Sequence, residues 1–194
     1  CLNGTHSTPA YLGQPSGRET VADAMQSEFI VGVLDALWKE VGEVLDAPSG
    51  VDPADYVASL RRRFCNPALK HRTLQIAMDG SQKLPQRLLA PLRARLARGL
   101  PVPALATAVA GWMHFVVKVA HTPDGQLNDP LAVELLARAR RASQPAEVVG
   151  HLLACEAVFG RDLADDAGFR RQLEEKFIEL GRRADLACAV RPAA

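Results

Sequence analysis

Apolar residues recur at three- and four-residue spacing along almost the whole chain, and this spacing places them on one face of a helix. Segments in which β-branched and polar residues alternate, the pattern of a half-buried strand, are almost absent. The clearest helical stripe contains Phe29, Ile30, Val33, Leu34, Leu37, Trp38, Val41, Val44 and Leu45. No long linker and no internal repeat divides the sequence. We therefore expect a single all-α domain.

Capping residues and turns predict the bounds of the helices. Ser27 and Asp52 are typical N-caps, and Pro53 suits a first helical position. Pro85 is expected in the first turn of its helix, where the missing N–H costs little, and Gly99 ends that helix. The expected helices span residues 28–45, 52–64, 73–78, 81–98, 105–120, 129–142, 145–159 and 167–190. The helix over 105–120 is apolar on nearly all sides, which predicts a buried, central position.

The composition is that of a soluble globular domain, because 48% of the 194 residues are hydrophobic and 23% are charged. A formal net charge of +1 provides no electrostatic attraction to nucleic acid or to an anionic membrane. The longest apolar stretch, residues 104–120, is interrupted by Lys118 and is shorter than the roughly 20 residues that span a bilayer. We therefore expect no nucleic-acid partner and no membrane partner.

The cysteines and histidines show no spacing that is typical of a metal site. Scattered cysteines in a domain of this size are typical of reduced proteins, so we expect free thiols and a cytoplasmic location. His114 lies within the apolar helix and is expected to be a core histidine. The cysteines are Cys1, Cys65, Cys155 and Cys188.

Two polar clusters could carry chemistry. In the first, Asn3 and His6 are three residues apart and would project from one helical turn. A carboxamide and a neutral imidazole together can bind a substrate hydroxyl and stabilise developing charge on oxygen. The pair could equally be a helix cap and a surface histidine.

The second cluster runs from Lys70 to Arg87. Lys83 is expected in the first turn of a helix, where its charge opposes the helix dipole unless the side chain points away or meets a ligand. The alternative without a ligand is a solvated basic turn, followed by a helix end and an N-cap at Asp79-Gly80-Ser81.

The same two clusters resemble the mannitol dehydrogenase family of long-chain, zinc-independent polyol and uronate oxidoreductases. The resemblance covers nearly the whole chain but only the C-terminal half of the family, and the pattern is most similar to that of fructuronate reductase, also called mannonate oxidoreductase. The segments that carry it are residues 3–7, 10–13, 17–25, 66–87 and 110–113, with Asp129-Pro130 and Phe159-Gly160.

The resemblance implies a domain organisation. Residues 1–194 would form a helical, substrate-binding C-terminal domain of the 6-phosphogluconate-dehydrogenase-like type. Its partner would be an N-terminal Rossmann domain that binds NAD and is absent from this chain. The family's catalytic lysine, five residues before the motif asparagine, would also precede the chain, so we expect the isolated chain to be inactive.

The resemblance also implies roles for individual residues. Asn3 would help to hold the reacting oxygen, and His6 would contact substrate hydroxyls. Lys83 would bind substrate. Gln75 stands where polyol-oxidising members commonly carry arginine, which favours a fructuronate or mannonate substrate over mannitol.

Two alternatives remain at this point. The chain could be a non-catalytic helical interaction module derived from such an enzyme, or a helical ligand-binding regulator. Pro9 and Pro15 favour the first alternative, because proline disrupts a helix interior. They predict a distorted segment around Asn3.

Overall fold

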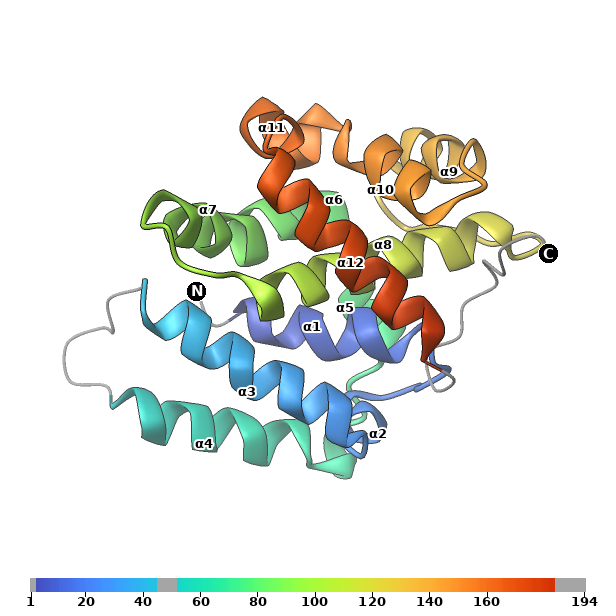
Figure 1. The fold of residues 1–194 in the computed structure, drawn as a ribbon. Helices are drawn as coiled ribbons and strands as arrows, with labels where there is room; N and C mark the ends of the chain where they lie inside the picture. Colours follow the sequence, from blue (N-terminus) through green and yellow to red (C-terminus); the bar gives the residue numbers. More distant parts are fainter. Residues whose placement is uncertain (1–2, 45–51, 184–194) are drawn as a thin grey trace.

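The computed structural model describes residues 3–44 and 52–183 and is built from helices (Figure 1). Within these ranges no strand forms, and the one β-bridge joins Thr20 to Arg72. The predicted all-α class is confirmed. The helices are α1 (Asn3–Gly13), α2 (Val21–Ala24), α3 (Glu28–Gly42), α4 (Pro53–Phe64), the 3-10 helix η1 (Pro67–Leu69), α5 (Thr73–Ala77), α6 (Gly80–Leu84), the π-helix η2 (Pro85–Leu89), α7 (Ala90–Ala97), α8 (Pro103–His121), α9 (Ala132–Arg140), α10 (Pro145–Leu153), α11 (Glu156–Ala164) and α12 (Ala167–Arg182).

Helix α8 is the centre of the fold, as its all-round apolar sequence predicts (Figure 1). It contacts α1, α3, α9 and α12. By length and composition α8 could cross a membrane, but 89% of its most apolar window is buried inside the molecule, which is typical of a core helix. The carboxylate of Glu40 on α3 caps its N-terminus, accepting from the amides of Ala104 at 2.7 Å and Leu105 at 2.9 Å.

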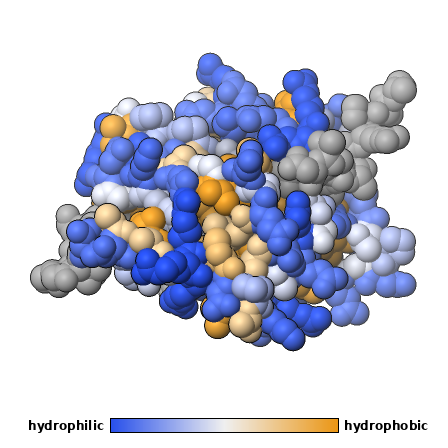
Figure 2. Space-filling model, turned by 90° about the horizontal axis from the view of Figure 1, so that it is seen from below, coloured by the Kyte–Doolittle hydropathy of each residue, from blue (hydrophilic) through white to orange (hydrophobic). Residues whose placement is uncertain are grey.

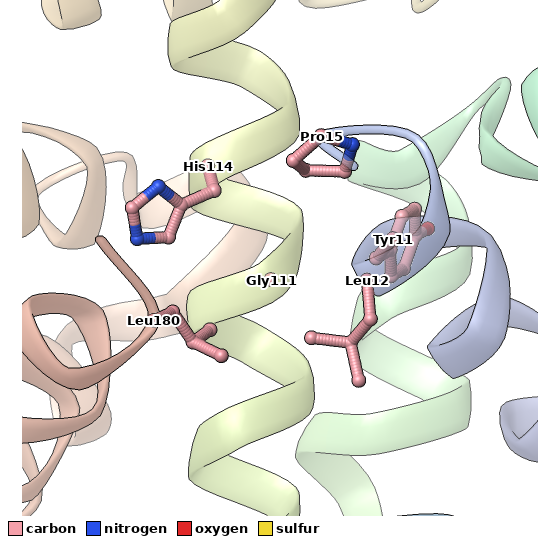
Figure 3. Close-up of a pocket in the computed structure, with 6 residues that line it drawn as sticks. All are labelled: Tyr11, Leu12, Pro15, Gly111, His114 and Leu180. Atoms are coloured by element: carbon pink, nitrogen blue, oxygen red, sulfur yellow. The ribbon is translucent and has the colours of Figure 1, made fainter. Parts of the chain in front are cut away.

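The seam between α1, α8 and α12 fixes the position of α1 (Figure 3). Gly111 has no Cβ, which lets Leu12 of α1 approach the backbone of α8 closely. His114 lies on the other side of α8, where Nε2 is 2.8 Å from the carbonyl of Phe177 and the two rings stack at 3.9 Å. The space between these residues is too small for a water molecule. His114 is therefore the predicted core histidine.

Helix α4 is amphipathic and lies at one edge of the molecule, against α3 (Figure 1). It buries Leu60 and Phe64, and Arg61 pairs with Asp35 of α3 and lies over the ring of Trp38 at 5.8 Å. Viewed from below, many of the coloured residues are hydrophilic, with a strip of hydrophobic residues between them (Figure 2).

Four predictions about helices need correction. Residues 81–98 are not one helix, because α6 is followed by the wider π-turn η2 before α7 begins. Pro85 has no N–H for the usual i to i−4 bond and its ring crowds the preceding turn, so a wider turn accommodates it. Residues 145–159 are also divided, because α10 ends at Leu153 and α11 begins at Glu156. The third is the helix expected from Asp129, which begins instead at Ala132. The fourth is the helix expected over 167–190, which ends at Arg182 because Arg183 is extended; residues 184–190 lie outside the described part of the chain.

The segment around Asn3 is not broken at Pro9, since α1 continues from Asn3 to Gly13. Proline removes one backbone bond, at a cost of about 3 kcal/mol in a helix interior. Burial of Tyr11 and Leu12 against α8 stabilises the helix despite this cost. Pro15 lies beyond the end of α1, where the ammonium group of Lys118 binds the carbonyls of residues 14 and 15.

Candidate functional site

A pocket of about 380 Å³ opens where α1, α5, α6 and η2 meet. It brings together three of the four predicted site residues, His6, Gln75 and Lys83, although they are far apart in the sequence. Asn3 begins the same helix as His6, and its side chain lies outside the described part of the structure. The residues that line the pocket are His6, His71, Arg72, Gln75, Ile76, Lys83 and Arg87.

The turn between α5 and α6 positions Lys83. Its ammonium group donates to the carbonyls of Met78 at 2.6 Å and Ile76 at 3.3 Å, and lies 3.9 Å from the carboxylate of Asp79. Of the two ways out of a conflict with the helix dipole, the side chain points away from α6, and its charge meets carbonyls at the end of α5. Burial lowers the pKa of Lys83, and the charge of Arg87 lowers it further.

Close packing holds this turn in place. Asp79 adopts a left-handed conformation with φ of 53°, and its amide donates to Asn128 at 2.9 Å. The amide of Ser81 donates to the carboxylate of Asp129 at 2.8 Å. Gly80 faces the indole of Trp112, and a Cβ at this position would overlap it. A side chain at residue 80 would therefore force the indole or the turn to shift.

A hydrogen bond to α1 holds Arg87 in place. Its guanidinium donates to the buried hydroxyl of Ser7 at 3.0 Å, and Ser7 follows His6 on α1. Together with Arg72 and Lys83, Arg87 gives the pocket a concentration of positive charge, and none of the lining residues in the described ranges is acidic. Such a wall attracts an anionic ligand, with guanidinium groups suited to a carboxylate.

The imidazole of His6 is half-buried and in contact with Phe64 of α4, with ring centroids 4.6 Å apart and planes at 73°. Burial lowers the pKa of His6 from 6.5 to about 4, and the charges of Arg63, His71 and Arg87 add to this effect. His6 is therefore neutral at pH 7. A neutral imidazole donates one hydrogen bond and accepts another, which suits recognition of a hydroxyl group.

Sequence reasoning placed Arg72 and Arg87 in the second cluster but did not select them, and it missed the contacts of Ser7 and Phe64. The density of basic residues was a usable signal for the two arginines. No group of three or more potential metal ligands occurs in the described ranges. The Gln75 side chain is exposed at the pocket wall, where it can donate to or accept from a ligand.

Comparisons with known proteins show which proteins this chain is similar to. D-mannonate oxidoreductase of Escherichia coli (strain K12) is 38% identical over 189 residues, which cover 96% of this chain and 39% of that protein. A mannitol 2-dehydrogenase of Phaeosphaeria nodorum is 31% identical and is matched over 33% of its length. The solved ternary complex of Pseudomonas fluorescens mannitol 2-dehydrogenase with NAD and D-mannitol superimposes with a TM-score of 0.83 at 27% identity.

The chain spans little more than a third of the length of these proteins. The superposition on the solved structure covers 93% of this chain and 37% of that one. The family model described as the mannitol dehydrogenase C-terminal domain matches residues 1–180. The chain therefore belongs to the mannitol dehydrogenase family, and the part of the family that it represents is the C-terminal domain.

Proposed function

We propose that this chain is the helical substrate-binding domain of an NAD-dependent oxidoreductase that acts on a sugar acid or a polyol, with fructuronate or mannonate favoured and mannitol next. The observation that carries the proposal is the pocket, which Arg72, Lys83 and Arg87 line together with a neutral His6. Cations suit the carboxylate of a sugar acid, and the imidazole suits its hydroxyl groups. The similarity to a D-mannonate oxidoreductase supports the same substrate class.

Each predicted residue has a role in this proposal. Lys83 and Gln75 bind the substrate, with the ammonium group of Lys83 already oriented by two carbonyls. His6 holds a substrate hydroxyl, and Asn3, one helical turn before it, stabilises charge on the reacting oxygen. Gln75 leaves the binding of the carboxylate to the neighbouring arginines.

The size of the pocket suits a sugar chain. The dinucleotide would be bound largely by a partner domain. A volume of about 380 Å³ lies at the small end of the range of ligand pockets, roughly 300–1,000 Å³. The sequence holds no glycine-rich phosphate loop, so the NAD phosphates would be bound by an N-terminal Rossmann domain of the same enzyme. NAD, when bound, supplies the hydride acceptor or donor at the nicotinamide ring. We also propose a cytoplasmic location, on the grounds given by cysteine usage.

Steady-state kinetics of a complete enzyme that carries this domain test the proposal. D-mannonate and D-mannitol are a matched pair, since they differ only by a carboxylate in place of a hydroxymethyl group. We expect kcat/KM to be at least about tenfold higher for mannonate oxidation, as one charge-assisted hydrogen bond of about 1.5–3 kcal/mol would give. Equal or better turnover of mannitol would contradict the assignment.

The variant Lys83→Met separates binding by this pocket from binding elsewhere. We expect it to reduce kcat/KM for mannonate by about tenfold or more, through loss of one charged contact. Lys39→Met is the matched control, because Lys39 is exposed on α3 and does not line the pocket. Equal effects of the two substitutions would show that the substrate binds at another place.

A further inference from the structure

Helix α4 contributes no residue to the lining of the pocket, yet its last residue contacts the imidazole that does line it. We propose that Phe64 is a positioning residue of the site, whose ring holds the imidazole of His6 in one orientation at the pocket wall and shields one side of it from water. The inference rests on the role proposed above for His6.

The geometry of the contact favours positioning over simple core packing. Phe64 is 1% exposed, so its ring cannot turn away into solvent. Its edge-to-face contact with His6 has a centroid distance of 4.6 Å and an interplanar angle of 73°, which is a preferred arrangement of two aromatic rings. Because the backbone of His6 is fixed in α1, this contact restricts the remaining rotation of the side chain about its χ angles.

Contacts on both sides of Phe64 along the chain hold it in position. Upstream, Arg61 pairs with Asp35 of α3, which ties the last turn of α4 to the body of the domain. Downstream, Asn66 caps η1 by accepting from the amide of Ala68 at 3.0 Å. The chain then reaches His71 and Arg72 in the pocket wall, so α4 and the wall belong to one short segment.

Shielding by Phe64 has an electrostatic consequence. The charged and titratable groups that act on His6 are Arg63 of α4, His71 before α5 and Arg87 of η2, and all three disfavour a proton on the imidazole. Burial is nevertheless the largest cause of the lowered pKa. A ring that turned toward water would regain a pKa nearer 6.5 and would lose its hydrogen-bond acceptor when protonated.

Imidazole NMR resonances of the 194-residue chain, followed through a pH titration, test the proposal without any enzymatic activity. The His6 resonance is assigned from its loss in His6→Gln. We expect His6 to titrate near pH 4 in the wild type and at least about one unit higher in Phe64→Leu, which keeps an apolar side chain but removes the ring. Phe64→Met is the second variant and serves if Phe64→Leu does not fold.

The matched control is Leu60→Ala. Leu60 is 2% exposed and lies one turn before Phe64 on α4, so its truncation loosens the same helix without removing the ring. We expect it to lower stability and to leave the titration of His6 within about 0.3 unit of the wild type. A wild-type His6 that titrates near 6.5, an unchanged value in both Phe64 variants, or an equal shift in Leu60→Ala would overturn the proposal.

Kinetics of the complete enzyme distinguish this inference from the proposed function. If His6 binds substrate and Phe64 positions it, Phe64→Leu moves the acidic limb of the kcat/KM profile upward by the same amount as the NMR titration. If His6→Gln leaves kcat/KM unchanged, the proposed role of His6 fails. The NMR result would still decide whether Phe64 orients and shields the ring.

Discussion

Replacing Gly80 by alanine tests whether the turn that carries Lys83 is as tightly packed as the structure indicates. A Cβ at residue 80 would overlap Nε1 of Trp112 and lie 3.0 Å from its Cδ1, where ordinary contacts are 3.4–4 Å. The indole is 1% exposed and lies edge-on to Phe159 at 5.9 Å, so it has no open space into which to move. The backbone of the turn or the indole must therefore shift.

The magnitude follows from two opposing effects. Overpacking of this kind costs about 3 kcal/mol, the upper part of the usual range, because the obstructing atoms belong to a buried ring. Alanine gains up to about 1 kcal/mol over glycine in a helix, which offsets part of that cost. We expect a net loss of about 2 kcal/mol, and a Tm that falls by about 4–8 °C in a protein of this size.

Gly32→Ala is the matched control, measured alongside by urea and thermal unfolding followed by circular dichroism. Gly32 lies inside α3, and a Cβ there meets nothing within 4 Å. Helix propensity alone then acts, so we expect a gain of about 0.5–1 kcal/mol. A Gly80→Ala protein as stable as the wild type, or a Gly32→Ala protein equally destabilised, would refute the reasoning.

Further predictions concern stability, pH and substrate. Glu40→Gln leaves one of two amide donors of α8 without a good acceptor, so urea unfolding should show a loss of about 1–3 kcal/mol. Because the folded-state pKa of His6 is about 4 and the unfolded value is 6.5, the unfolded state binds more protons between these values. Stability should therefore rise with pH across this window and fall as pH drops, and His6→Gln should flatten the dependence. In a complete enzyme, Gln75→Arg should raise kcat/KM for mannitol relative to fructuronate, since a guanidinium offers paired donors to hydroxyl groups. The isolated chain, mixed with NADH and fructuronate, should show no change in NADH absorbance above the blank.

Local patterns predicted most of the fold correctly. The stripe of α3, the N-caps Ser27 and Asp52, and the buried helix α8 all appear as expected, because each depends on residues within a few turns. The π-turn at Pro85 could not be predicted in the same way. Apolar periodicity over residues 81–98 is nearly the same for one helix as for α6, η2 and α7 in succession, so the spacing does not reveal an inserted turn.

Helix α1 shows where local rules mislead. Proline inside a helix predicts distortion, and the sequence offers no measure of the tertiary packing that opposes it. In the structure Leu12 lies against Gly111 of α8, and Lys118 binds the carbonyls that follow α1. Packing of this kind depends on residues about a hundred positions away, so only the folded structure shows that it outweighs the proline.

The candidate site could likewise be predicted from the sequence only in part. Spacing alone indicated two polar clusters, each of which could also have a purely structural role. The resemblance to a family selected His6, Gln75 and Lys83, and the pocket brings these three residues together. Phe64 was invisible to both approaches, because an apolar residue at the end of an amphipathic helix is expected in any core. Its significance depends on which side chain it touches. The protonation state of His6 is therefore a property of the tertiary structure, since burial is the main cause of its lowered pKa and its ring contacts Phe64 of α4.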